Sequence, residues 1–126
     1  MAVRGKHRER GAAAVEFALV VPILLLLVLG IIEFGRAYQV QTTLSAAARE
    51  GARTMALDND VAAARQATKD FFPGLSLTDD QIAITPATCG ADEAARVTIT
   101  RPYSFITGFF GTEISMTSVG SMRCGG

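Results

Sequence analysis

The sequence predicts an α+β fold: a long N-terminal membrane helix that continues outside the membrane, a second helix, and a small three-stranded antiparallel sheet. Three observations support this. Residues 17–32 carry no charge, residues 35–57 are alanine-rich and contain no proline, and beyond Gly74 apolar and polar residues alternate with period two. A chain of 126 residues has room for one small domain and an anchor, and not for two independent folds.

The membrane helix is predicted over residues 12–34. The uncharged run from Phe17 to Ile32 extends back to Ala12 if Glu16 is tolerated. A bilayer needs about 20 residues at about 1.5 Å each, so this segment is long enough to span. The basic residues of positions 1–11 place the N-terminus in the cytoplasm and the rest of the chain outside. A retained anchor is favoured over a secretory signal, because the small-residue cleavage site expected after such a run is weak here.

The exported part, residues 35–126, is predicted to begin as an amphipathic continuation of the membrane helix over residues 35–57. Gly51 weakens this helix by up to about 1 kcal/mol relative to alanine. Asp58 or Asn59 is predicted to end it and to cap a second helix over residues 61–72, which Pro73 and Gly74 terminate. A calcium loop at residues 58–60 is disfavoured, because the required glycine and distal glutamate are missing.

Three short strands are predicted after the helices. They centre on Ile82 and Ile84, on Val97 and Ile99, and on Ile114 and Met116, with Pro86 and Pro102 bounding the first two. In the apolar loop 103–111, packing of Phe105 and Phe109 beneath the second helix is favoured over a subunit contact.

Two cysteines, Cys89 and Cys124, fall on the exported side. Because thiols can be oxidised there, a disulfide is favoured over free thiols. Closing so long a loop would stabilise the domain by about 4 kcal/mol in the chain-entropy model. This matters for a domain whose core alone is marginal.

Composition argues against enzymes, metal proteins and nucleic-acid binders. The single histidine, His7, lies in the basic leader, so the exported part has no histidine for general-base chemistry. The sequence contains no phosphate-loop, dinucleotide, HExxH or CxxC motif. Residues 1–11 carry a net charge of +3 and the rest of the chain −3, so no basic surface is left for nucleic acid once the short N-terminal run is set aside. We therefore expect a non-enzymatic protein with no cofactor, no metal and no small-molecule substrate.

Glu16 is an ionisable residue at the start of the membrane helix. A carboxylate costs about 2.5–3.5 kcal/mol at the bilayer centre and less near the surface, so such a residue is a functional candidate. The alternative is that Glu16 reaches water at the cytoplasmic interface. The residues of the helix alone leave both interpretations open.

The string RGAAAVEFAL, residues 10–19, resembles the class III signal of type IV pilin-like proteins. Taken over residues 10–37, together with AAAREGAR at residues 46–53, the sequence is similar to the TadE-like family. Members of that family are minor pilins or pseudopilins of the tight-adherence (Tad, Flp) pilus system.

The resemblance implies that a prepilin peptidase cuts between Gly11 and Ala12, so that residues 1–11 are a leader and Glu16 becomes the fifth residue of the mature chain. It also implies that Glu16 and Phe17 interact with other subunits, Glu16 meeting the Ala12 amine of a neighbour. The expected location is the bacterial inner membrane, single-pass, with the pilus or the medium as later destinations. Expected partners are other Tad pilins and the membrane platform proteins of this secretion-like system. The alternative is a membrane-anchored extracytoplasmic binding or sensor domain unrelated to pili.

Overall fold

The structure, a computed structural model, describes residues 2–125, with side chains from His7 onward. The predicted leader residues Met1, Arg4 and Lys6 therefore lie outside the described side chains. The chain divides into two compact units, Met1–Gly35 and Arg36–Gly126. The helix α1 (Ala2–Asp58) forms the first unit and continues into the second, where it is joined by helix α2 (Val61–Phe71), two short 3₁₀ helices (Pro73–Leu75 and Asp79–Gln81) and three strands.

The helices of the second unit begin and end at identifiable caps. The backbone of Asn59 is left-handed, with φ 51°, which ends α1. Asp60 is the N-cap of α2, because its Oδ1 accepts hydrogen bonds from the backbone N–H groups of Ala62 at 2.9 Å and Ala63 at 3.2 Å. The prediction that Asp58 or Asn59 would cap this helix is therefore wrong by one or two residues. Asn59 instead adopts the left-handed backbone conformation of the turn between the two helices.

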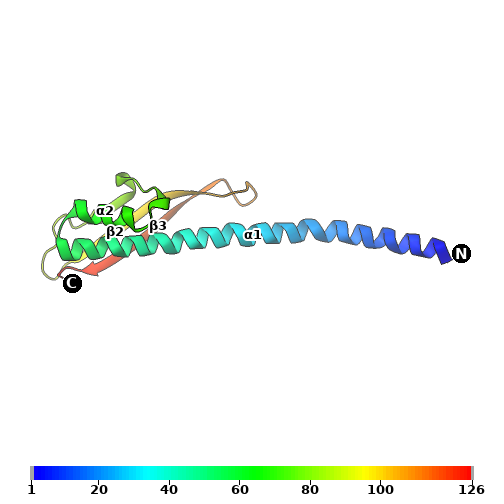
Figure 1. Ribbon diagram of the computed structural model, residues 1–126, viewed down its shortest axis with the longest axis horizontal. Helices are drawn as coiled ribbons and strands as arrows, with labels where there is room; N and C mark the ends of the chain where they lie inside the picture. The colour runs from blue at the N-terminus through cyan, green and yellow to red at the C-terminus, as the bar shows by residue number, and fades with distance from the viewer. Residues whose placement is uncertain (1, 126) are drawn as a thin grey trace. The chain divides into compact units, whose positions relative to one another are not determined.

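The sheet has the strand order β1-β2-β3 and is antiparallel throughout, as the sequence predicts. β1 is Ile82–Thr85, β2 is Ala94–Ser104 and β3 is Glu113–Arg123. Figure 1 shows these strands running alongside the last part of α1. The longer strands β2 and β3 extend well past the predicted centres, so Pro102 lies inside β2 instead of ending it. Pro102 is tolerated because β1 pairs only with residues 96–99 of β2, which leaves that edge unpaired at position 102.

One face of the sheet packs against α1. Alternate residues of β2 and β3 are buried there, and they meet a stripe of small and apolar residues on the helix. The core of this unit consists mainly of Leu44, Ala47, Ala48, Ala52, Leu75, Ile82, Val97, Ile99, Tyr103 and Met116.

Two glycines allow the backbones to approach closely. A Cβ at Gly120 of β3 would lie 2.3 Å from the backbone carbon of Ala48, and a Cβ at Gly51 of α1 would lie 2.0 Å from Oγ1 of Thr68 in α2. The helix α1 therefore packs closely against β3 at Gly120 and against α2 at Gly51.

Polar contacts join α1 to β3 beside this core. The side-chain nitrogen of Gln41 donates hydrogen bonds to the backbone oxygen of Thr117 at 3.0 Å and to Oγ of Ser118 at 2.8 Å. The hydroxyls of Ser45 and Ser118 lie 3.3 Å apart. β3 is an edge strand, and Gln41 occupies one of its backbone acceptors.

Candidate functional site

The predicted processing and assembly residues lie on the first part of α1. The Gly11–Ala12 bond is within the helix, and a Cβ added at Gly11 would meet nothing within 4 Å. Glu16 and Phe17 are also exposed, Phe17 to 72%. Glycine is the weakest ordinary helix former, by about 1 kcal/mol against alanine, so the helix is weakened at the predicted cleavage point.

The helix brings Ala12 and Glu16 onto one face. Residues four apart are one turn apart, with a rise of about 6 Å, and their side chains are neighbours. An amine at residue 12 and the carboxylate of Glu16 would therefore be close within one chain. The same pair is equally open to a neighbouring helix, because both residues are exposed.

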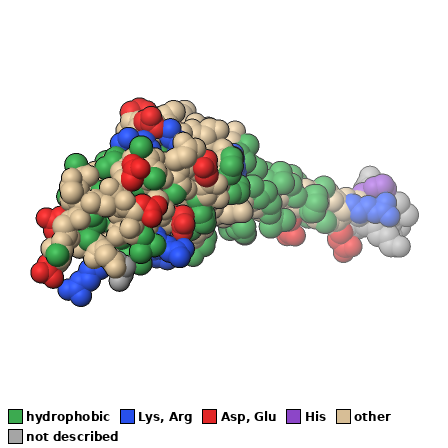
Figure 2. Space-filling model, turned by 60° about the vertical axis from the view of Figure 1, so that its left-hand side comes forward, with side chains coloured by type: hydrophobic (Ala, Val, Ile, Leu, Met, Phe, Trp, Pro, Cys, Tyr) green, Lys and Arg blue, Asp and Glu red, His purple; other side chains and the backbone are tan. Residues whose placement is uncertain are grey.

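The segment that follows is an apolar surface with no protein cover. Its large hydrophobic side chains are exposed, from Val15 and Phe17 through the leucine run to Ile31 and Ile32. Figure 2 shows hydrophobic side chains along this stretch, with Arg and His side chains at the N-terminal end of the helix. Among the described residues, α1 is the one helix long and apolar enough to cross a membrane. An N-terminal apolar helix of this kind fits a single-pass membrane anchor.

Glu33 is a residue that the sequence analysis passed over. Its side chain is 1% exposed, and among the described residues it is the one buried acidic or basic side chain. Burial of a carboxylate requires hydrogen bonds or an opposite charge. The signal in the sequence was its position, directly after the apolar run.

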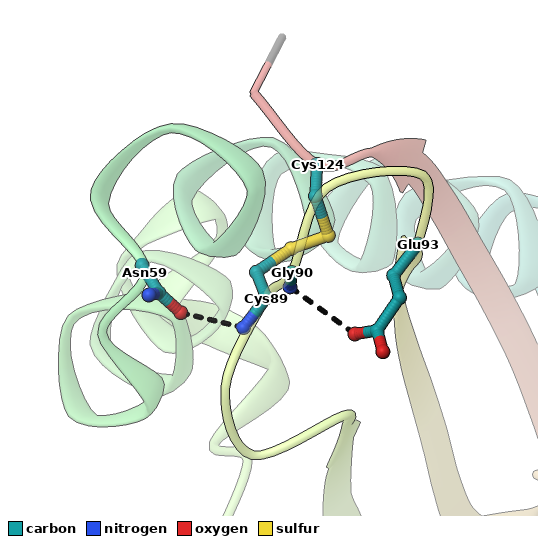
Figure 3. Close-up of a disulfide and its surroundings, with 5 residues drawn as sticks. All are labelled: Asn59, Cys89, Gly90, Glu93 and Cys124. Carbon is teal, nitrogen blue, oxygen red and sulfur yellow. Dashed lines mark hydrogen bonds between the residues drawn. A yellow bond between two sulfur atoms is a disulfide. The ribbon is translucent and has the colours of Figure 1, made fainter.

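The disulfide predicted between Cys89 and Cys124 is present, with 5.7 Å between the two Cα atoms. Figure 3 shows its surroundings: the backbone N–H of Cys89 donates to Oδ1 of Asn59 at 2.7 Å, and the N–H of Gly90 donates to Oε2 of Glu93 at 3.1 Å. The N–H of Cys124 donates to the backbone oxygen of Glu93 at 2.9 Å. The disulfide therefore joins the β1–β2 loop to the residue after β3, and the hydrogen bond from Cys89 to Asn59 links this loop to the turn that follows α1.

At the opposite end of this unit, Arg36 lies over the ring of Tyr103, with its Cζ 5.7 Å from the ring centroid. These two residues line a cleft of about 290 Å³ together with Arg101, Phe72 and other residues of that end. Among the described residues, no group of three or more His, Cys, Asp or Glu side chains is placed to hold a metal ion.

One ion pair in the second unit lowers the pKa of a carboxyl group. Lys69 of α2 pairs with Asp79, which begins the second 3₁₀ helix. The hydrogen bond from Lys69, together with its charge and that of Arg65, holds the pKa of the Asp79 carboxyl below its usual range. The pair links α2 to the segment leading into β1.

The prediction that Phe105 and Phe109 pack beneath α2 is not borne out, because the core cluster that Phe105 joins contains no residue of α2. Phe105 is half-buried, packs against the core and meets Tyr103 edge-to-face at 5.5 Å between ring centroids. Phe109, however, is 71% exposed, so its predicted packing beneath α2 is wrong. The strands carry the loop past the covered part of the sheet, which the sequence pattern could not reveal.

Comparison with known proteins finds one family. Residues 11–53 match the family model described as TadE-like protein. The match begins at the predicted cleavage point and ends at Arg53, inside the part of α1 that packs on the sheet. The resemblance seen in the sequence is confirmed over these residues. No curated protein and no solved structure matches the chain.

Proposed function

We propose that this chain, TadE-like over residues 11–53, is a minor pilin or pseudopilin that takes part in assembling a Tad-type adhesive pilus. The observation that carries the proposal is the family match across a helix whose apolar run is exposed. Such a surface needs a non-aqueous neighbour. The bilayer supplies one before assembly, and a bundle of pilin helices supplies one afterwards. The role is structural and involves no catalysis by this chain.

The proposed life of the protein has two stages. It is first inserted in the inner membrane, with the basic leader in the cytoplasm and residues 35–126 outside. A prepilin peptidase then cuts between Gly11 and Ala12, which leaves the helix attached and creates a new amine at Ala12. The platform proteins of the Tad system and other pilins are the proposed partners of the processed chain.

Glu16 has a distinct task in each stage. In the membrane, its carboxylate and the new Ala12 amine lie one turn apart and offset each other's charge. In an assembled bundle, the exposed position of both groups lets Glu16 meet the amine of another subunit, which fixes the axial register between helices. Breaking a buried pair on one side costs about 3–5 kcal/mol, because the remaining charge is stranded.

The test is Glu16→Gln, which keeps the size of the side chain and removes its charge. We expect membrane insertion and cleavage after Gly11 to remain largely intact, while pili or co-purification with other pilins are lost. Glu9→Gln is the matched control, since Glu9 belongs to the leader that is removed before assembly. Normal pilus numbers in the Glu16→Gln strain would refute the proposed role of Glu16.

The alternative function, an anchored binding or sensor domain, is supported by the folded, disulfide-closed unit from Arg36 onward. Processing separates the two. Mass spectrometry of the membrane-extracted protein should find Ala12 as the N-terminus. An intact N-terminus in cells that contain the peptidase would favour the anchored sensor.

A further inference from the structure

The hairpin between β2 and β3 ends in an uncharged, apolar tip, residues 105–112. Four of its eight residues are Phe or Ile, and none carries a charge. Two backbone contacts close the tip: the N–H of Phe105 donates to the oxygen of Thr112 at 3.2 Å, and Phe109 and Gly111 form a bridge. Phe109 is 71% and Ile106 61% exposed. The tip therefore presents large apolar side chains to its surroundings on a fixed backbone.

The tip lies at one defined end of the second unit. The N–H of Gly125, just after β3, donates to the backbone oxygen of Ala56 near the end of α1. At the other end of the strands, Tyr103 of β2 lies under Arg36. The strands therefore run along residues 36–56 of α1 with the tip beyond the Arg36 end. Figure 1 shows the hairpin reaching past the end of α2 in that direction.

This end is where the chain enters from the membrane. Arg36 follows the predicted span, residues 12–34, by two residues, which is a rise of about 3 Å along a helix. A bilayer that ends at residue 34 would put the side chain of Arg36 at the depth of the lipid headgroups, with the ring of Tyr103 beneath it. The apolar tip lies beyond Tyr103, at the same end of the second unit as Arg36.

The surroundings of the tip fit lipid. Arg36 and Arg101 line the cleft at this end, and guanidinium groups bind phosphate well. Phe72 lines the same cleft and is half-exposed. Apolar and aromatic side chains backed by cations are typical of segments that lie in the boundary between headgroups and acyl chains.

We propose that the β2–β3 tip inserts Phe109 and Ile106 into the face of the bilayer at which the membrane helix emerges. The inference rests on the membrane anchor of the proposed function and not on pilus assembly. It gives the domain a second contact with the membrane before the chain leaves for a filament.

The absence of tryptophan from this sequence provides a clean reporter. Phe109→Trp places one tryptophan at the tip of the full chain, which is reconstituted in phosphatidylcholine and phosphatidylglycerol vesicles with bromine on the acyl chains. Val119→Trp is the matched control, because Val119 is also exposed, to 49%, but lies six residues along β3 from the foot of the hairpin. Leu26→Trp, in the middle of the apolar run, reports whether the anchor is inserted.

We expect the fluorescence of the Phe109→Trp variant to be quenched by the brominated lipid and shielded from aqueous iodide, with the Val119→Trp variant showing the opposite. The Leu26→Trp variant should be quenched by the lipid in the same preparation.

Lipid quenching of the Leu26→Trp variant but not of the Phe109→Trp variant would overturn the inference and leave the anchor untouched. Loss of quenching in both would overturn the anchor and the inference with it. If the iodide shielding of the Phe109→Trp variant disappears when protein is diluted in lipid, the tip contacts a second copy of the chain, and the inference is equally overturned.

Discussion

Gly51→Ala offers a sharp test of how α1 packs. Alanine at an exposed helix position is favoured over glycine by about 0.8–1.0 kcal/mol, so the sequence alone predicts a gain in stability. The structure predicts a loss. Gly51 is buried, and the added methyl group would lie 2.0 Å from Oγ1 of Thr68 and 3.3 Å from Cγ2 of Val97.

The size of the stability loss depends on whether Thr68 can move away from the added methyl group. Thr68 is fully buried, and its hydroxyl donates a hydrogen bond to the backbone oxygen of Ala64 at 2.8 Å. Rotating the side chain away would break that bond and leave a buried hydroxyl without it. Overpacking of this kind costs about 1–3 kcal/mol, which exceeds the helix gain. We therefore expect Gly51→Ala to destabilise the domain by about 1–2 kcal/mol, or about 4–16 °C in melting temperature at about 4–8 °C per kcal/mol.

Thr68→Ala removes the atom with which the new methyl group collides. In that background the remaining contacts of a Cβ at Gly51 are at 3.3 and 3.4 Å, close to ordinary packing. The same Gly51→Ala change should then be neutral or stabilising by up to about 1 kcal/mol. The destabilising effect should disappear or reverse in sign, with a coupling energy of about 1–3 kcal/mol between the two positions.

The assay is thermal unfolding of the four proteins of this cycle in detergent, followed by circular dichroism. Equal effects of Gly51→Ala in the two backgrounds would show that Gly51 and Thr68 do not touch, and would refute the packing described here. A stabilising effect in the wild-type background would do the same.

Three further outcomes are expected. Gly120→Ala should destabilise the domain by about 1–3 kcal/mol, because the added methyl group would collide with the backbone of α1, which no side-chain movement can relieve. Gly108→Ala is the control and should melt like wild type, because a Cβ there would meet nothing within 4 Å. Equal melting temperatures of the two variants would contradict the close packing at Gly120. Cys124→Ser should lower the unfolding free energy by about 4 kcal/mol in the chain-entropy model, measured by urea titration; an unchanged midpoint would argue against a structural disulfide. Asp79→Asn should lower the urea midpoint slightly at pH 7. The pKa of Asp79 is lower in the folded state than its unfolded value of about 3.9, so its pairing with Lys69 stabilises the fold above that value. This stabilisation is lost as the pH falls through the lower folded pKa. A difference in urea midpoint between Asp79→Asn and wild type that persists in strong acid would be the contrary result.

The elements were predictable because periodicity reports them directly. The long apolar run, the alanine-rich continuation and the alternation after Gly74 are local patterns, and α1, α2 and the three strands follow from them. Strand ends were not predictable in the same way. Pro102 forbids one backbone hydrogen bond, but whether that bond is needed depends on how far β1 extends beside it.

The residues of the candidate site were likewise predictable only where a local sequence pattern marks them. Gly11, Ala12, Glu16 and Phe17 form a linear motif, so sequence alone was sufficient to name them as candidates. The exposure of Phe109 and the burial of Glu33 depend on which segments cover them, and no local pattern encodes that. The need for glycine at position 51 likewise comes from tertiary packing. The sequence shows that Gly51 weakens the helix, but it does not show that Gly51 faces Thr68.

The close fit at Gly120 has a mechanical consequence. A helix that touches a strand backbone-to-backbone cannot slide along the strand or turn about its own axis without collision, so residues 36–58 of α1 and the sheet must move together. A pull along this stretch of helix reaches β2 and β3 as a load parallel to the strands. β3 is joined to β2 over eleven residue pairs, so the two strands receive that force as one unit.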